Sequence, residues 1–271
     1  RDGFWNYYYL QRFGTPRLLS HWLGLMIFRG QFEETAKTFV TFVAHRELPY
    51  FKQIRENMSK NWGNWKFLVE QMQSFPTHFN QELSLITHLR DNPSDFVGAL
   101  HQIQDQVRLW IYAYDSYLFN RLLSDLILEG NVPPVLPLIT SFNASDWQPY
   151  RTFLDADGVS LPAPALRNFP FVRLESRTLA TKQQLEIHGF KVKDKFAIFS
   201  FSLPKGAYAT TFLINFFTLS AGLPRVPDLP DEAIDSKKLL SLGSLESTLK
   251  YFQPLFDKYK KLGAVSTPED L

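Results

Sequence analysis

The chain has 271 residues, of which 45% are hydrophobic and 21% are charged, so it can bury a sizeable core as one elaborated domain or two. It contains no cysteine, which excludes a disulfide framework, thiol catalysis and a thiolate metal site, and which suits a reducing compartment, with the cytoplasm as the expected location. No apolar run approaches the roughly 20 residues of a membrane helix.

The formal net charge of +2 is too small by itself to imply a polyanionic partner, but basic residues concentrate in two segments. Residues 1–29 have a balance of +3 and residues 167–205 a balance of +5. If the two segments are neighbours in space, they form one positive face, which is typical of nucleic-acid binding. Two ordinary solvated surfaces are the alternative.

The first half of the chain is predicted to be mainly helical. Up to about Gly14 the sequence is densely aromatic, which favours an extended conformation. From residue 16 to about residue 128, apolar residues recur at steps of three and four, and the breaks between them predict six or so helices. One helix is expected to start at Ser94-Asp95, and the strongest spans Val107 to Ile127 and ends at Gly130.

The second half is predicted to contain shorter elements. Residues 132–165 should be irregular with one strand, and residues 169–177 should form another strand. The clearest strand spans residues 196–203, where polar and apolar side chains alternate. A helix is expected over residues 209–219, ended by Gly222, and a further helix near residues 245–251, before an acidic, frayed end.

Several side chains of the helical region are assigned to packing. The tryptophans of the W-G-N-W sequence at residues 62–65 are expected at a helix junction, and a stripe at helical spacing is expected in the core: Trp110, Tyr114, Tyr117 and Leu118. Polar residues share this second helix, and if they are buried they need partners. They are therefore predicted to fix the contact between the helix and the sheet: Asp115, Ser116 and Asn120.

The common enzyme motifs are absent from the sequence. The six histidines never have a metal-ligand spacing, and there is no G-x-S-x-G elbow, phosphate-binding G-x-x-x-x-G-K-[ST] loop or G-x-G-x-x-G turn. We therefore expect no metal-dependent catalysis.

Two segments carry chemistry that packing does not explain. Residues 6–14 combine amides, phenols and a guanidinium, which are groups that stack on bases, read base edges and hold phosphate. Residues 203–211 form a predicted strand-to-helix turn, which places a lysine, exposed amides and Tyr208 at a helix N-terminus, where phosphate is favoured.

These segments and a third one resemble the TruD family of RNA pseudouridine synthases. Residues 6–14 are similar to the family's N-Y-[FY]-G-x-Q-R-F-G motif, residues 113–120 to its A-x-Q-S-x-x-F-N helix and residues 203–211 to its L-P-x-G-[SA]-[YF]-A-T turn. The three segments occur in the family's order. Tyr9 replaces a glycine of the first motif, and Asp115 replaces the glutamine of the second.

The resemblance implies an α/β (α+β) pseudouridine synthase fold with a mixed sheet. Residues 1–29 and 181–271 would form part of the catalytic domain, and residues 30–180 a mostly helical insertion. The implied reaction detaches a uracil from its ribose, rotates it and rejoins it through carbon 5, with a catalytic aspartate and without cofactor or metal. RNA, with tRNA as the expected substrate, would be the partner.

The resemblance also assigns site residues by position. Asn6 matches the family's uridine-pocket asparagine, Tyr8 its stacking aromatic and Tyr208 the pocket aromatic of the turn, while Arg12 and Lys205 are candidates for RNA contact. The family's aspartate lies in a G-x-K-D-x-x-A-x-T-x-Q segment before the first motif, and only five residues precede it here. We therefore expect the nucleophile outside this chain, the chain alone to be inactive, and sheet edges to be unpaired.

Two other functions stay open at this point. One is a non-catalytic RNA-binding protein derived from the same fold, and the other is a helical partner-binding module built from residues 30–128. The pseudouridine synthase interpretation requires the two ends of the chain to fold together, so that the rings of Tyr8 and Tyr208 enclose a cleft the size of a nucleobase.

Overall fold

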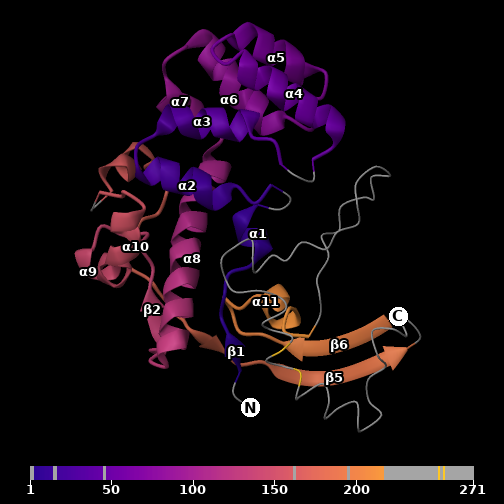
Figure 1. The fold of residues 1–271 in the computed structure, drawn as a ribbon, viewed down its shortest axis with the longest axis vertical. Coiled ribbons are helices and arrows are strands. Elements are labelled where there is room, and N and C mark those ends of the chain that lie inside the picture. The colour runs from indigo at the N-terminus through magenta and orange to yellow at the C-terminus, as the bar shows by residue number, and fades with distance from the viewer. Residues whose placement is uncertain are drawn as a thin grey trace.

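The computed structural model describes residues 3–14, 17–44, 47–160, 163–193 and 196–216, together with residues 250 and 253. Helices dominate these residues, and short strands gather at one end of the molecule (Figure 1). This combination of helices with small sheets confirms the predicted α/β class.

The described residues between 20 and 129 form seven successive helices, in agreement with the six or so predicted. They are α2 (Ser20–Phe28), α3 (Phe32–Thr41), α4 (Pro49–Lys60), α5 (Trp65–Gln73), α6 (Asn80–Asp91), α7 (Phe96–His101) and α8 (Gln104–Glu129). The Asp95 side chain caps α7 by accepting a hydrogen bond from the Gly98 amide (2.8 Å), as the sequence indicated. Gly130 ends α8 in a left-handed conformation (φ 74°).

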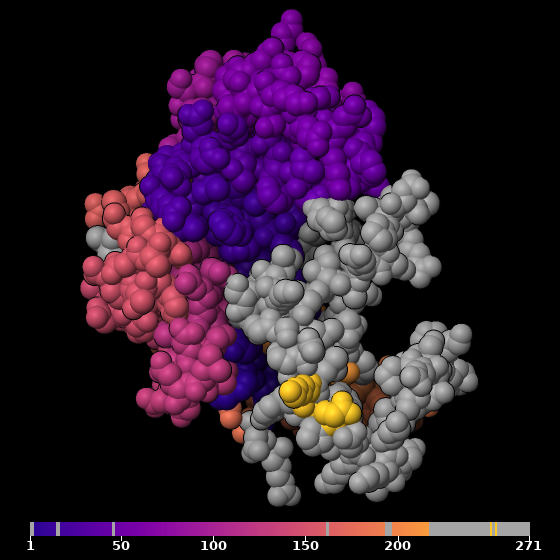
Figure 2. Space-filling view, viewed as in Figure 1, coloured from indigo at the N-terminus to yellow at the C-terminus, as the bar shows by residue number. Residues whose placement is uncertain are grey.

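Helix α8 is the axis of the molecule. Helices α3–α7, which we call the helical lobe, form a rounded mass at one end, and α8 extends away from it (Figures 1 and 2). Helix α2 crosses α8 at very short range, because a Cβ added to Gly24 would lie 2.1 Å from the Trp110 carbonyl oxygen and 2.8 Å from the Tyr114 Cβ. Glycine is therefore required at this crossing.

Two hydrophobic clusters lie along α8. The upper one fills the helical lobe, includes the fully buried Trp110 and Tyr114, and is bordered by the partly buried Trp62 and Trp65. These two tryptophan rings meet edge to face at 5.0 Å, which confirms the predicted helix-junction packing. The lower cluster joins distant parts of the chain: Tyr8, Phe13, Ala113, Phe119, Leu123, Leu136 and Leu138.

Residues 178–183 hold the small strands together. They include β3 (Thr178–Ala180), which pairs with β2 (Val135–Pro137), and β4 (Lys182–Gln183), which pairs with β1 (Phe4–Trp5). Between them, the Thr181 amide donates to the Pro134 carbonyl, and the Thr181 carbonyl accepts from the Asn6 amide. The hairpin of β5 (Glu186–Lys193) and β6 (Phe196–Ser202) follows, and all these pairs are antiparallel.

Some local predictions were wrong. Leu10–Phe13 forms the one-turn helix α1, not an extended segment, because this turn buries Phe13 completely and ends at Gly14 (φ 80°). Residues 169–177 form no strand, since buried Phe169 and Val172 pack into the upper cluster, and at the end of the run the Arg177 carbonyl accepts from the Leu138 amide (2.8 Å) beside the β2–β3 pair. The predicted strand at residues 196–203 is confirmed as β6, but its partner β5 was not foreseen.

Other elements are shorter than predicted or unforeseen. Residues 132–165 contain the predicted strand, β2, but also the short helices α9 (Ala144–Trp147) and α10 (Arg151–Ala156). The expected helix over residues 209–219 is α11 (Ala209–Leu213), and residues 217–219 with Gly222 lie outside the described residues. The helix predicted near residues 245–251 also lies outside them, apart from residue 250.

Substitution of Gly24 by alanine tests the α2–α8 crossing. The added methyl group would overlap the Trp110 carbonyl, so we expect a loss of about 1–3 kcal/mol in the free energy of unfolding. Gly189→Ala is the control, because no atom lies within 4 Å of its added Cβ. Equal denaturation midpoints for the two variants would contradict the close crossing.

Candidate functional site

Three segments that are far apart in the sequence meet beside α8. They are residues 6–14, the α8 residues 113–120 and the turn of residues 203–211 that leads into α11 (Figure 1). Their side chains form a group that we call the pocket cluster: Asn6, Tyr8, Arg12, Asn120 and Tyr208. The two ends of the chain therefore fold together, as the sequence predicted.

Asn120 holds Tyr8 through both of its backbone groups. Its Oδ1 accepts from the Tyr8 amide and its Nδ2 donates to the Tyr8 carbonyl, each at 2.9 Å, and both residues are buried. The side-chain amide thus replaces the neighbouring strand that this irregular segment lacks. The prediction that Asp115, Ser116 and Asn120 fix the contact between this helix and the sheet is confirmed in part. Asn120 and Asp115 bond to segments that follow β1 and β2, Asp115 by accepting from the Ile139 amide (2.8 Å), whereas Ser116 donates to the Tyr112 carbonyl of its own helix (2.6 Å).

The turn before α11 is attached to the first segment by two threonines. Thr211 donates from Oγ1 to the Tyr7 carbonyl (2.7 Å), and Thr210 donates to Oε1 of Gln11 (2.8 Å). Tyr7 in turn shares a hydrogen bond of 3.1 Å with Ser124 of α8. Sequence reasoning missed these links, although the A-T-T sequence after Tyr208 could have indicated them.

Tyr8 and Tyr208 contact each other directly. Their ring centroids are 5.6 Å apart at an interplanar angle of 56°, and Phe119 meets the Tyr8 ring edge to face at 5.7 Å. A base between two parallel rings would require a separation of about 7 Å, twice the 3.4 Å stacking distance. The two rings are therefore neighbours, as predicted, but in this structure they close against each other and do not enclose a base-sized gap.

Arg12 connects the two rings. Its Nη2 donates to the Tyr208 hydroxyl (2.9 Å), and its guanidinium carbon lies 5.1 Å from the centroid of the Tyr8 ring. The cation thus lies on the aromatic surface of the pocket cluster. Burial, with the nearby Asp115 carboxyl as a second cause, raises the pKa of the Tyr8 phenol well above its ordinary value, so Tyr8 is neutral at physiological pH.

Two buried polar atoms of the first segment have no hydrogen-bond partner among the residues that the structure describes. Asn6 is 1% exposed and donates from Nδ2 to the Ala180 carbonyl (3.0 Å), but its Oδ1 accepts no hydrogen bond from a described residue. The Nε of Arg12 is likewise buried and has no partner in the described part of the chain. Buried polar atoms are nearly always satisfied in folded proteins, so an unused acceptor and an unused donor in one motif indicate capacity for a ligand.

Lys205 lies in the same turn as Tyr208 but on the surface. It is exposed and precedes Gly206, whose φ of 93° suits glycine. The structure therefore brings together Tyr8, Arg12 and Tyr208. Asn6 lies two residues before Tyr8 with its side chain on the Ala180 carbonyl, and Lys205 lies on the surface three residues before Tyr208.

Asp115 is a buried carboxyl behind the pocket cluster. It is 3% exposed, and burial raises its pKa to about 7, while the Ile139 amide, Arg12 and Arg177 act in the opposite direction. His21, which packs on Phe13 at 5.3 Å, has its pKa lowered by burial to about 4. Each group is thus shifted toward its neutral form, as expected for ionisable groups in an apolar environment.

The described residues contain neither a candidate membrane helix nor a candidate metal site. No helix among them is long and apolar enough to cross a membrane. Among the same residues, no three side chains of the metal-ligating types converge on one point.

The family model described as tRNA pseudouridine synthase D (TruD) matches residues 1–137, which is just over half of the chain. The chain belongs to the TruD family. The resemblance inferred from the three motifs is therefore confirmed.

Relatives in archaea share this family. A protein named "Probable tRNA pseudouridine synthase D" from Methanopyrus kandleri is 31% identical over 229 residues, covering 77% of this chain and 56% of the relative. A protein of the same name from Archaeoglobus fulgidus is 24% identical over 255 residues, covering 78% of this chain and 61% of the relative. The chain thus spans somewhat more than half the length of these TruD relatives.

A solved structure supports the fold. The crystal structure of a protein described as a tRNA pseudouridine synthase D from Methanosarcina mazei matches with a TM-score of 0.65 at 22% identity. The match covers 78% of this chain and 60% of the other. At this identity the likeness establishes the TruD fold for the matched part of the chain.

Asn120 provides a test of the pocket cluster's framework. Asn120→Ala leaves the Tyr8 amide and carbonyl buried without partners, so we expect a loss of roughly 2–5 kcal/mol in the free energy of unfolding. Asn168→Ala is the control, because that amide makes one exposed hydrogen bond. A loss in Asn120→Ala no larger than in the control would show that this pairing does not hold the segment.

Asp115 provides a test of the electrostatics. Its folded pKa of about 7 lies above the ordinary 3.8, so the folded state binds the proton more tightly and stability falls as pH rises between these values, by at most about 1.4 kcal/mol per pH unit. Asp115→Asn has no group that titrates at this position. The free energy of unfolding of the variant minus that of the parent should therefore increase from pH 4 to pH 7.

The difference between the two profiles isolates Asp115, because His21 is present in both proteins. The lowered pKa of His21 makes the free energy of unfolding rise with pH between about 4 and 6.5, which opposes the contribution of Asp115 in the parent. Asp105→Asn, at an exposed position, is the control. Parallel profiles for Asp115→Asn and the parent would refute the raised pKa of Asp115.

Proposed function

We propose that the complete protein carrying this chain is an RNA pseudouridine synthase that isomerises a flipped-out uridine, with tRNA as its substrate. The chain's membership of the TruD family and the names of its relatives support this proposal. The observation that carries it is the convergence of Tyr8, Arg12 and Tyr208 from opposite ends of the chain into one cluster.

The pocket cluster offers the contacts that a uridine needs. A base that leaves its stack requires aromatic surfaces and partners for its edge. Tyr8 and Tyr208 supply the aromatic surface, and the unpaired Oδ1 of Asn6 is a ready acceptor for the N3–H of uracil. The guanidinium of Arg12 supplies positive charge for a carbonyl or phosphate oxygen, and exposed Lys205 extends that charge to the RNA backbone.

Binding requires the two tyrosine rings to separate, since their present contact leaves too little room for a base between them. Tyr208 is the ring that we expect to move. It is only partly buried and is held by one hydrogen bond to Arg12, whereas Tyr8 is 6% exposed and anchored by Asn120. The base would thus exchange the Tyr8–Tyr208 contact for contacts of its own with both rings.

The reaction needs no cofactor in this proposal. The bond from the ribose to N1 of uracil breaks, the base rotates, and a new bond forms from the ribose to carbon 5; carbon 5 then loses its proton and N1 gains one, so that the product is an isomer of uridine. The aspartate implied by the family resemblance would act on this nucleoside, and no residue of this chain is assigned that role. The described residues bind and orient the base.

The division into domains stays part of the proposal. Residues 1–29 and 181–271 would contribute to the catalytic domain and residues 30–180 to the helical insertion, although α8 and β2 share the lower cluster with Tyr8 and Phe13. The cytoplasm is the proposed location, since a chain without cysteine suits a reducing compartment.

Conversion of uridine in a tRNA transcript tests the activity. The complete protein is incubated with unmodified tRNA, and pseudouridine is measured by mass spectrometry after nuclease digestion. We expect one or a few positions to be converted. Tight, salt-sensitive RNA binding without conversion would instead support a non-catalytic RNA-binding protein.

Tyr208 is the residue for a mutational test. Tyr208→Ala should lower kcat/KM for RNA about 5- to 150-fold, which corresponds to roughly 1–3 kcal/mol, because a stacking surface is lost. Tyr208→Phe keeps the ring and removes only the bond to Arg12, so its effect should be smaller. Tyr50→Ala, at an exposed position of the helical lobe, is the control. An unchanged kcat/KM for Tyr208→Ala would show that this ring is no part of the pocket.

A further inference from the structure

We infer that Arg17 is a positioning residue, which fixes helix α1 against the helical lobe and thereby sets the geometry of the pocket cluster. The inference deepens the proposed function and rests on it for what the cluster binds. The coupling between Arg17 and α1 is a property of the protein alone and is measurable without RNA.

Arg17 caps the end of α3. Its Nη2 donates to the carbonyl oxygens of Phe39 (2.7 Å) and Phe42 (3.2 Å), and its guanidinium lies over both of their rings. The last carbonyls of a helix have no partner within the helix, so a guanidinium at this point satisfies groups that would otherwise be unpaired. A residue four positions after the end of α1 thus completes a helix of the lobe.

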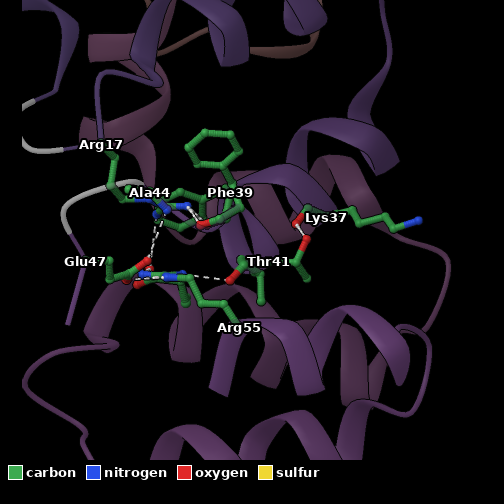
Figure 3. Close-up of polar contacts among 10 residues, drawn as sticks. Arg17, Lys37, Phe39, Thr41, Ala44, Glu47 and Arg55 are labelled. Carbon is green, nitrogen blue, oxygen red and sulfur yellow. Dashed lines mark hydrogen bonds and ion pairs between the residues drawn. The ribbon is translucent and has the colours of Figure 1, made fainter. Parts of the chain in front are cut away.

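Arg17 also belongs to a buried ionic network. Its Nη1 lies 3.5 Å from Oε1 of Glu82 in α6, and the same oxygen pairs with Nη2 of Arg55 at 3.0 Å. Arg55 bonds further to Glu47 (2.6 Å) and to the Val40 carbonyl (2.7 Å). Figure 3 shows Arg17 and Arg55 extending into this network from different elements.

The charges of the network balance, with two arginines and two glutamates. Arg55, Glu82 and Glu47 are each less than 10% exposed, and loss of one partner would leave a buried charge unpaired. Burial, together with repulsion from Arg55, lowers the pKa of Arg17 to about 10, which keeps it charged at physiological pH. Arg17 is therefore held firmly by the lobe.

The described residues between α1 and α2, namely Gly14 and residues 17–19, connect this hold to the pocket cluster. Gly14 ends α1, and its carbonyl accepts from the Leu18 amide at 2.8 Å. Leu18 has a φ of 52°, which is unfavourable for a leucine and persists only where its surroundings impose it. The Leu18 side chain packs against the lower cluster and that of Leu19 belongs to the upper one. Three successive side chains thus have different surroundings: Arg17 joins the ionic network, Leu18 packs on the lower cluster and Leu19 belongs to the upper cluster.

Helix α1 depends on such external contacts because a single turn has little stability of its own. It carries Arg12, whose bond to Tyr208 lies at the centre of the pocket cluster. Two residues before α1, Tyr8 is bonded to Asn120. Four residues after α1, Arg17 is bonded to the helical lobe. Release of the second attachment leaves α1 free to shift and moves Arg12 away from Tyr208.

Hydrogen exchange in the complete protein tests the coupling. Arg17→Lys keeps a positive charge near Glu82 but lacks the planar fork that reaches two carbonyls. We expect the amides of Arg12 and Leu18 to exchange about 5- to 10-fold faster, while the amides of α8 keep their rates. Arg90→Lys, whose guanidinium pairs with Asp91 on the surface, is the matched control and should change neither set.

A second variant separates Arg17 from general weakening of the lobe. Arg55→Lys disturbs the same network but leaves the bonds from Arg17 to Phe39 and Phe42. It should accelerate exchange in α4 and α6 more than in α1. If α1 responds equally to Arg55→Lys and Arg17→Lys, or to neither, the positioning role is refuted.

Kinetics on tRNA complete the test. A pocket that is assembled only part of the time raises KM by the inverse of the assembled fraction and leaves kcat nearly unchanged, so we expect a KM about 5- to 10-fold higher in Arg17→Lys. Simple loss of folded protein would lower the apparent kcat and leave KM as it was, and this result would contradict positioning. If no variant or parent converts uridine, the proposed function fails, while the exchange result still decides the coupling.

Discussion

The paired hydrogen bonds between Asn120 and the backbone of Tyr8 are the contact on which the rest of the site depends. They occupy both backbone groups of a buried residue that belongs to no strand. Without them the first motif would lack a partner at the point where it turns toward α1. Because Asn120 lies on α8, the axis of the molecule also determines where the pocket cluster forms.

The cluster is built as a closed but incomplete unit. The rings of Tyr8 and Tyr208 contact each other. Arg12 makes a cation–π contact with Tyr8 and donates a hydrogen bond to Tyr208. The Oδ1 of Asn6 and the Nε of Arg12 are nevertheless buried, and neither has a partner among the described residues. A nucleobase would suit both the rings and these polar atoms, since it has flat faces that stack on rings and polar atoms at its edge. This combination accounts for why the site contracts on itself and still has capacity for a ligand.

The sequence predicted local elements where local signals were strong. Asp95 as a cap, Gly130 as a terminator and the alternation of residues 196–203 each act within a few residues, and all three are confirmed. Predictions failed where distant packing decides the conformation. Residues 169–177 have the composition of a strand but bury their apolar side chains against helices, and the short turn at Leu10–Phe13 exists because Phe13 enters the lower cluster.

The site itself was predictable only through the family resemblance. Tyr8 and Tyr208 are 200 positions apart, and nothing in this spacing indicates that their rings touch. The order of the three motifs, matched to the family, indicated that the two segments meet. The resemblance could not reveal the direct contact between the rings or the unpaired atoms of Asn6 and Arg12, because these depend on side-chain positions. The role inferred for Arg17 likewise required the coordinates.

Photo-crosslinking of the complete protein to tRNA that carries 4-thiouridine at the modified position tests the central claim most directly. If residues from both ends of the chain form one nucleoside pocket, mass spectrometry should find crosslinks in the peptide with Tyr8 and in the peptide with Tyr208. Crosslinks confined to helices α3–α7, with none to either tyrosine peptide, would contradict the account.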